Sequence, residues 1–217
     1  MIGPFFDPGW VVDNLSDIGV QTREHIFLTL IAVVLGLLIS LPLGIYAYRH
    51  GRAHGPIVSI AGILYTIPSL ALFASLVPFF GLSTTTGEVG LVSYTLLILI
   101  RNVVAGLRGV PEDAKEAARG MGYTARQLLW HVELPLAVPA ILAGIRIATV
   151  TTIGLVTVTA LIGQGGLGYF ILLGLQRFFA TAVIVGAVLS VLLAVLADRL
   201  LLLIERRLTP WSVRRAA

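Results

Sequence analysis

The sequence predicts an all-α membrane protein with about five transmembrane helices. Of its 217 residues, 57% are hydrophobic and only 12% are charged, whereas soluble domains carry about 25% charged residues. The mean hydropathy is +0.96. The apolar residues also gather into five stretches, each long enough to cross a hydrocarbon layer of about 30 Å, which takes roughly 20 helical residues. Cysteine is absent, which excludes disulfides and thiolate metal sites.

The segment before the first stretch, residues 1–25, is expected to lie on the extracytoplasmic side. It carries four acidic residues and one arginine, and it lacks the basic start of a secretory signal, so we expect no cleavage. Trp10, Val11, Leu15 and Ile18 could form one face of a short interfacial helix. A plain extracytoplasmic tail is an equal alternative.

The transmembrane domain is predicted to cover residues 26–205. The chain contains 23 glycines and 10 prolines. A membrane protein tolerates them because neighbouring helices satisfy the backbone groups that a break frees, but they argue against straight spans. The fourth stretch is long enough to tilt or to leave the membrane before its end. The five stretches are 26–48, 57–80, 89–108, 136–162 and 180–204.

The basic residues predict the orientation, because cytoplasmic loops carry the excess of arginine and lysine. The opposite side would hold only Arg23 and Arg177 near the membrane. We therefore expect the N-terminus outside, the C-terminus in the cytoplasm and a basic cytoplasmic tail at 206–217. The positive charge thus indicates topology, and no nucleic-acid partner is expected. The predicted cytoplasmic basic residues are Arg49, Arg52, Arg108, Lys115, Arg119, Arg126, Arg206, Arg207, Arg214 and Arg215.

The longest cytoplasmic loop, residues 109–135, predicts a short helix. Pro111 suits the first helical position, and the acidic pair 112–113 lies in the first turn, where the helix dipole favours negative charge. Alanines follow, which favour a helix. Gly120 or Gly122 is expected to end it.

A second short helix is predicted after this glycine turn. Thr124 and Gln127 have the spacing of a capping box, and the helix runs through the apolar residues 128–130 before Pro135 and Pro139 open the fourth span. Two such helices bury little by themselves. They form either a hairpin packed on its own membrane domain or a docking site for a cytoplasmic partner, and physical reasoning leaves both open.

The same loop carries a family motif. Its spacing resembles the EAA signature of binding-protein-dependent ABC importer permeases: EAA, three residues, G, nine residues, I, one residue, LP. Valine replaces the isoleucine here. In those permeases the loop is the coupling helix that sits in a groove of the ATP-hydrolysing subunit, and the resemblance implies this role for residues 112–130. The matching residues are Glu116, Ala117, Ala118, Gly122, Val132, Leu134 and Pro135.

The resemblance extends over about residues 25–205. Three segments resemble permeases that import osmoprotectants or quaternary amines, such as glycine betaine, choline, carnitine or proline betaine. These segments are IRNVVAGLRGVPEDAKEAARGMG, HVELPLAVPAILAGIRIATVTTIG and ALIGQGGLGYFILLGL. The implied fold is that of type I ABC importer permeases of the methionine-transporter kind, with an outside N-terminus. The implied partners are a second permease subunit, identical or homologous, two ATP-binding subunits, an extracytoplasmic substrate-binding protein and membrane lipid.

The chain itself is expected to bind no cofactor and no metal. It has no GxxxxGK[ST] nucleotide motif, and Lys115 is its only lysine. ATP and Mg would be used by the partner ATPase. No HExxH motif or evident nucleophile–base pair stands out, and the histidines are scattered, so an intramembrane enzyme is not expected.

Three polar residues lie inside the predicted spans. Arg101 and Asn102 are in the third and Arg146 is in the fourth, where an ionisable group is costly unless it faces protein or water. The arginines either line the transport path or hold the bundle together through backbone carbonyls and helix ends. The second role is favoured, because a bare guanidinium repels a quaternary ammonium cargo that lacks a carboxylate. Asn102 is the expected partner of Arg101.

The stretch LIGQGGLGYF at 161–170 marks the extracytoplasmic end of the fourth span. It is either an outer gate near the pathway or a tight turn that needs positive φ at several glycines. Tyr65, Phe73 and Tyr94 could also contact a quaternary ammonium by cation–π attraction, although packing and interfacial belts are commoner uses of such rings. The candidate gate or pathway residues are Gly163, Gly165, Gly166, Gly168 and Tyr169.

The expected function is the membrane subunit of an ATP-driven osmoprotectant importer in the cell membrane, whose loop couples ATPase closure to alternating access. Two alternatives stay open. A type I permease for another cargo, such as methionine or another amino acid, would keep the mechanism and change the substrate. A passive channel or membrane scaffold would need the 112–130 hairpin to be packed on itself, and the EAA spacing disfavours it.

Overall fold

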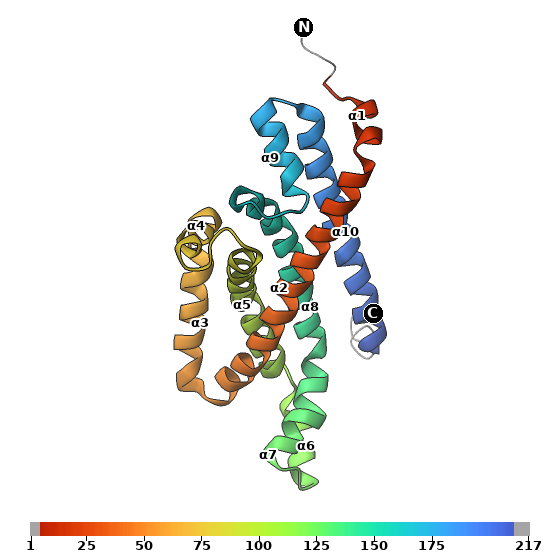
Figure 1. Cartoon of the computed structure of the whole chain (residues 1–217). Helices are drawn as coiled ribbons and strands as arrows, with labels where there is room; N and C mark the ends of the chain where they lie inside the picture. The colour runs from red at the N-terminus through yellow and green to blue at the C-terminus, as the bar shows by residue number, and fades with distance from the viewer. Residues whose placement is uncertain (1–4, 211–217) are drawn as a thin grey trace.

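The computed structural model describes residues 5–210, and this range contains helices but no strand. The first four residues of the N-terminal segment, and Arg214 and Arg215 of the predicted basic tail, lie outside the described residues. The helices are α1 (Pro8–Asp13), α2 (Leu15–Arg49), α3 (Gly51–Thr66), α4 (Ser69–Phe80), α5 (Thr84–Arg108), α6 (Glu112–Gly120), α7 (Ala125–Leu128), α8 (Leu134–Thr159), α9 (Gly168–Arg177) and α10 (Ala180–Leu208). Helices α6 and α7 project at one end of the bundle, and α1 and α9 lie at the other (Figure 1).

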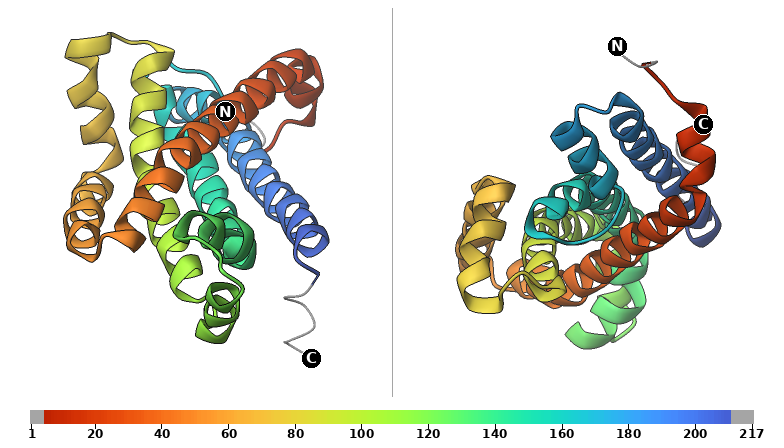
Figure 2. Two further views of the ribbon diagram at one scale, coloured as in Figure 1. Left: turned by 90° about the horizontal axis from the view of Figure 1, so that it is seen from below. Right: turned by 45° about the horizontal axis from the view of Figure 1, so that its top comes forward.

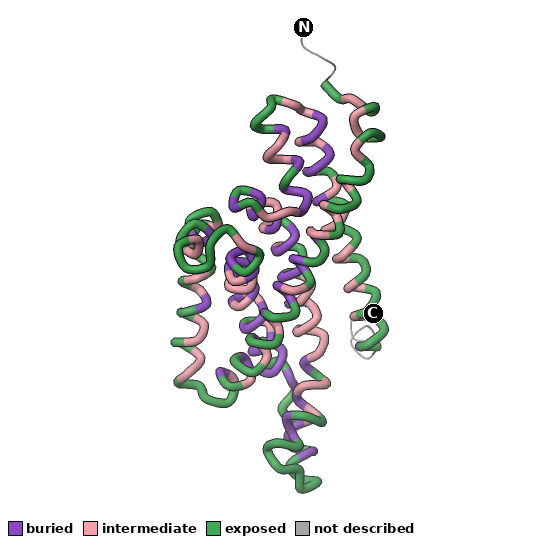
Figure 3. Tube along the Cα trace, in the orientation of Figure 1, coloured by how far each residue is buried: buried purple, intermediate pink, exposed green. Residues whose placement is uncertain are grey.

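Helix α5 forms the centre of the bundle. It is buried along most of its length, with α2 and α8 packed against it (Figure 3). Glycines allow the close approach, since a Cβ at Gly36 would lie 1.9 Å from Thr95 Oγ1 and a Cβ at Gly44 would lie 2.6 Å from Val103 Cγ1. The sequence separation between the α2 residue and the α5 residue is the same in both pairs. Contacts therefore advance in the same direction along both helices, so α2 and α5 run parallel.

The first span begins well before the predicted residue 26, because α2 already starts at Leu15. It crosses the bundle obliquely from the α10 side to the α3 side (Figure 2). Before it, α1 carries Trp10, whose ring meets Phe170 and Phe179 edge to face with centroids 6.0 and 5.3 Å away. The N-terminal segment is therefore not a plain tail, and the interfacial location of its helix stays a prediction. Its described part docks on α9 and α10, through contacts that no local pattern could reveal.

The second predicted span, 57–80, is not one straight helix. It consists of α3 and α4, which are bent by 96° relative to each other. Pro68 has no backbone N–H and holds Ile67 in an extended conformation, with φ −64° and ψ 128°. Among the described residues, four single helices are long and apolar enough to cross a membrane, and a fifth span exists if the bent pair is one span.

The fourth predicted span, 136–162, also begins earlier. Helix α7, a π-helical turn at Leu129–Glu133, helix α8 and a 3₁₀ turn at Ala160–Ile162 follow one another without a break. The Leu134 N–H bonds to the Leu129 carbonyl, five residues back, and this wider turn accommodates Pro135, which cannot donate. The second loop helix is therefore the start of the fourth span and not a separate element.

Gly168 lies where α9 approaches α8. A Cβ there would be 2.1 Å from the Thr157 carbonyl oxygen, a backbone atom that cannot move aside alone. We expect Gly168→Ala to lower the free energy of unfolding by about 1–3 kcal/mol, the usual cost of overpacking, seen as a lower thermal midpoint in detergent. Gly154→Ala is the control, because nothing lies within 4 Å of a Cβ there. Equal midpoints for the two variants would contradict this packing.

Candidate functional site

The candidate coupling loop has the two predicted helical segments and the predicted turn. Helix α6 ends at Gly120, and Gly122 has φ +83°, which favours glycine. The predicted capping box is confirmed. Gln127 N–H donates to Thr124 Oγ1 at 3.3 Å, and Thr124 N–H donates to Gln127 Oε1 at 2.9 Å.

The residues of the EAA-like motif do not share one environment. Glu116, Ala117 and Gly122 are exposed, Ala118 is fully buried, and Val132, Leu134 and Pro135 are half-buried. Thus Ala118 packs against its own chain, whereas the projecting end of the loop is largely exposed (Figure 3).

The loop is packed at its base and free at its tip. Leu128 and Leu129 are buried, whereas Trp130 exposes 55% of its surface, and Met121 and Tyr123 are also exposed. Part of the predicted apolar face, Leu128 and Leu129, therefore packs on the chain's own membrane domain. The other part, Trp130, is exposed and available to a partner. A hollow of about 490 Å³ lies beside the exposed indole, lined by Thr124, Arg126, Gln127, Trp130 and His131. Exposed apolar groups beside polar ones are typical of a surface for a protein partner.

Charges within α6 stabilise the loop helix. Glu112 lies 2.9 Å from Arg119 Nη1 and 3.2 Å from Lys115 Nζ. Hydrogen bonds from Arg119 and Lys115 hold the pKa of Glu112 below its ordinary value. The carboxylate is consequently ionised at neutral pH, and this contribution to folding is present at neutral pH and is lost as the pH falls through the lowered pKa.

The glycine-rich stretch is a turn that is tied to α2. Gly163 and Gly166 have φ +77° and +92°, so the predicted positive φ is confirmed at these two glycines. Gln21 Oε1 accepts the Gly166 N–H at 2.7 Å, and His25 Nδ1 accepts the Leu167 N–H at 3.1 Å.

His25 joins three segments and was missed by sequence reasoning. It is fully buried. Because its Nδ1 accepts a hydrogen bond, its Nε2 carries the proton and donates to the Ile153 carbonyl at 3.0 Å. The signal was the spacing of Gln21, Glu24 and His25 on one helical face, which went unread because the helix was expected to begin later.

The other residues of the predicted gate have different surroundings. A Cβ at Gly165 would lie 1.6 Å from Glu24 Oε2, so this glycine serves close approach and not a positive φ. Tyr169 is exposed. A hollow of about 360 Å³ at this end is lined by Glu24, Phe27, Leu28, Thr84, Gly163, Gln164 and Gly165. The arrangement leaves the gate role of this stretch a prediction.

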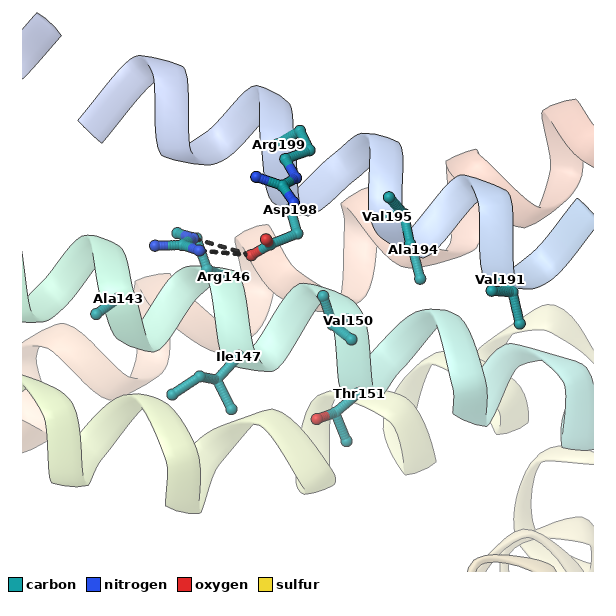
Figure 4. Close-up of a pocket in the computed structure, with 10 residues that line it drawn as sticks. All are labelled: Ala143, Arg146, Ile147, Val150, Thr151, Val191, Ala194, Val195, Asp198 and Arg199. Carbon is teal, nitrogen blue, oxygen red and sulfur yellow. Dashed lines mark hydrogen bonds and ion pairs between the residues drawn. The ribbon is translucent and has the colours of Figure 1, made fainter. Parts of the chain in front are cut away.

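Arg146 connects α8 to α10. Its Nε donates to Asp198 Oδ1 at 2.9 Å, and its Nη1 donates to Glu205 Oε2 at 3.0 Å. The clamp predicted from sequence therefore exists, but it binds carboxylates and not backbone carbonyls. It stands at one end of an otherwise mostly apolar hollow of about 640 Å³ between these helices (Figure 4), lined by Ala143, Arg146, Ile147, Val150, Thr151, Val191, Ala194, Val195, Asp198 and Arg199.

Arg101 and Asn102 do not form the predicted network. Arg101 is exposed and has no ion pair or hydrogen bond among the described residues. Asn102 instead donates to the Ile98 carbonyl at 2.8 Å, and its side chain packs on Gly144 of α8, where a Cβ would lie 2.5 Å from Asn102 Cβ. Adjacent helical residues point in different directions, which explains the separation.

The aromatic residues proposed to contact a cargo are mainly packing residues. Phe73 is fully buried, against Gly90. Tyr65 and Tyr94 meet edge to face at 5.8 Å, and the Tyr94 hydroxyl donates to the Ile67 carbonyl at the bend between α3 and α4. These contacts favour the packing role over contact with a cargo.

Comparisons with known proteins agree with this architecture. Residues 32–210 match the family described as "Binding-protein-dependent transport system inner membrane component". The choline transport system permease protein OpuBB of Bacillus subtilis (strain 168) is 40% identical over 202 residues, covering 93% of each chain. The osmoprotectant import permease protein OsmW of Salmonella typhimurium (strain LT2) is 37% identical over 210 residues, covering 94% of this chain and 98% of that one.

A solved structure has the same fold. The inward-facing MetNI methionine ABC transporter contains a chain that superposes with a TM-score of 0.81 at 25% identity, covering 88% of this chain and 96% of that one.

Proposed function

The chain belongs to the family of binding-protein-dependent transport system inner membrane components, and we propose that it is the permease subunit of an ATP-driven importer of an osmoprotectant of the betaine or choline class. It is a multi-pass membrane permease with the type I ABC importer fold. The observation that carries the cargo class is identity of 37–40% over nearly the full chain to permeases named for choline and osmoprotectant transport. The methionine transporter is less similar, at 25% identity.

The proposal assigns energy and specificity to partners. Two ATP-binding subunits would use ATP and Mg, a second permease subunit would complete the path, and an extracytoplasmic binding protein would deliver the cargo. Neither a cofactor nor a nucleotide site is assigned to this chain. In this arrangement the N-terminus is outside and the C-terminus is in the cytoplasm.

The coupling role is assigned to residues 112–130. Its support is the EAA-like spacing together with an exposed tip around Met121, Tyr123 and Trp130. Closure of the ATPase dimer on ATP pushes the two loops together, and α7 continues into α8 through the π turn, so the push reaches the fourth span directly. The spans then move between inward-open and outward-open states, which ATP and cargo bias in turn.

Uptake in proteoliposomes tests this proposal. The vesicles would contain the permease together with the ATPase and the binding protein that neighbouring genes encode. Radiolabelled glycine betaine and choline would be supplied with and without ATP. We expect at least one of the two amines to accumulate in an ATP-dependent way, and we expect excess methionine not to compete with its uptake. Vesicles given a non-hydrolysable ATP analogue are the control.

Two other results would change the proposal. Competition by methionine, or uptake of neither amine while the ATPase still binds, would keep the importer class and reject the cargo. Uptake that is equal with and without ATP would support a passive channel and reject the importer.

A further inference from the structure

The base of the coupling loop is bonded to the inner end of α2. The Tyr48 hydroxyl donates to Glu133 Oε1 at 2.8 Å, across 85 residues of sequence. Glu133, the last residue of the π turn, is only 5% exposed. A buried carboxylate is costly without a partner, so this hydrogen bond fixes the position of α2 relative to the start of the fourth span.

Lys115 of α6 lies at the same joint. It is only 7% exposed, and its Nζ lies 3.2 Å from Glu112 Oε2 and 5.9 Å from the centre of the Tyr48 ring. Burial alone would lower the pKa of Lys115, but hydrogen bonds with Glu112 and Tyr48 raise it above its ordinary value. The ammonium therefore stays charged and attracts both the Tyr48 ring and the Glu112 carboxylate.

Further contacts reinforce the joint. Tyr48 and Leu134 pack against a buried cluster that contains Leu129 together with Val103, Leu107 and Ala137. In addition, Arg49 Nη2 donates to the Ala125 carbonyl at 2.7 Å. All three segments of the loop, namely α6, α7 and the π turn, are thus attached to the last turn of α2. By contrast, Met121 and Tyr123 at the tip are exposed, and so is the Trp130 side chain of the π turn.

We propose that Tyr48, Lys115 and Glu133 are positioning residues that make the inner end of α2 move together with the coupling loop. A push on the free tip cannot be absorbed by bending at the base, so it tilts α2 and α8 as one body. This inference rests on the proposed function and adds to it the residues that transmit the movement. Residues along such a network typically change coupling about two- to thirtyfold when mutated.

Transport per ATP hydrolysed is the first test, in proteoliposomes of the complete complex. Tyr48→Phe removes only the hydroxyl, and we expect it to lower the cargo imported per ATP by about two- to thirtyfold while assembly with the ATPase stays normal. Tyr46→Phe is the matched control, because Tyr46 lies on the same helix and is half exposed. If the Tyr48→Phe complex imports as much cargo per ATP hydrolysed as the unaltered complex, the inference is overturned.

A double variant separates a shared joint from two local defects. Glu133→Leu removes the acceptor of the Tyr48 hydroxyl, so Tyr48→Phe/Glu133→Leu should be no worse than Glu133→Leu alone. Glu133→Gln keeps an acceptor oxygen and should restore most of the ratio. Additive losses in the double variant would contradict a joint formed by this bond.

A distance measurement tests the joint independently of the cargo. The chain has no cysteine, so spin labels at Leu43→Cys in α2 and Asp113→Cys in α6 are specific, and diluting labelled with unlabelled subunits restricts the signal to one subunit. We expect one distance that ATP does not change in the assembled complex, and a broader or ATP-dependent one in Tyr48→Phe. If uptake of both amines fails but this difference is found, only the cargo assignment is lost. Identical distances in both proteins would overturn the joint.

Discussion

Replacing Arg146 by methionine is expected to lower the free energy of unfolding of the subunit by about 2–4 kcal/mol. Methionine replaces the apolar stem of the arginine with a side chain of similar character but removes the guanidinium. Asp198 and Glu205 are then left without their shared partner. Removing one member of a buried pair costs about 3–5 kcal/mol. The expected loss is somewhat smaller, because the three side chains expose 20–34% of their surface. Thermal unfolding in detergent measures it.

The neighbouring arginine supplies the control for this experiment. Arg199 lines the same hollow (Figure 4) and has no ion pair among residues 5–210. Arg199→Met should therefore leave the unfolding midpoint nearly unchanged. Neutralising the carboxylates together with the arginine, in Arg146→Met/Asp198→Asn/Glu205→Gln, should recover much of the loss, because no charge is then left unpaired. A midpoint for Arg146→Met equal to that of Arg199→Met would show that the clamp contributes little.

Reversing the charge of Glu116 is expected to weaken binding of the ATPase subunit at least about thirtyfold, since a wrong charge at an interface costs about 2 kcal/mol or more. Glu116 is exposed on α6, so Glu116→Lys should leave membrane insertion and the unfolding midpoint intact. ATP-driven uptake should then be lost. Affinity for the purified ATPase, measured with the permease in nanodiscs, separates this effect from misfolding.

Asp113→Lys makes the same charge change on the same helix, outside the EAA-like motif. It should lower affinity for the ATPase far less than Glu116→Lys, because of these two positions only 116 belongs to the EAA-like motif. Normal uptake by Glu116→Lys would be incompatible with the coupling assignment. Equal losses in both variants would instead indicate a general requirement for negative charge on α6.

Several long-range contacts connect α8 and α2 with other parts of the bundle. Arg146 ties α8 to α10, and Glu133 ties the start of α8 to α2. At the other end, Gln21 and His25 of α2 hold the glycine turn. These contacts connect α2 directly with the segment that the sequence marks as a candidate gate.

The sequence by itself determined the features that depend on neighbours along the chain. A hydrocarbon layer requires long apolar helices, so the end of α5 and the start of α10 were predicted closely. The end of α6 at the glycine turn and the capping box of Thr124 were also predicted. Caps and turns act within four residues, and a motif such as EAA is read position by position. These properties also sufficed to indicate the family.

Only the tertiary structure decided which faces of the helices meet. Arg146 finds its carboxylates 52 and 59 residues away, and His25 accepts a hydrogen bond from a residue 142 positions along the chain. Arg101 and Asn102 are adjacent in sequence yet have separate surroundings, because successive helical residues point to different sides. The size and direction of the 96° bend at Pro68 were likewise beyond prediction. Proline disfavours a straight helix, but it is packing against α5 that fixes the direction of the bend.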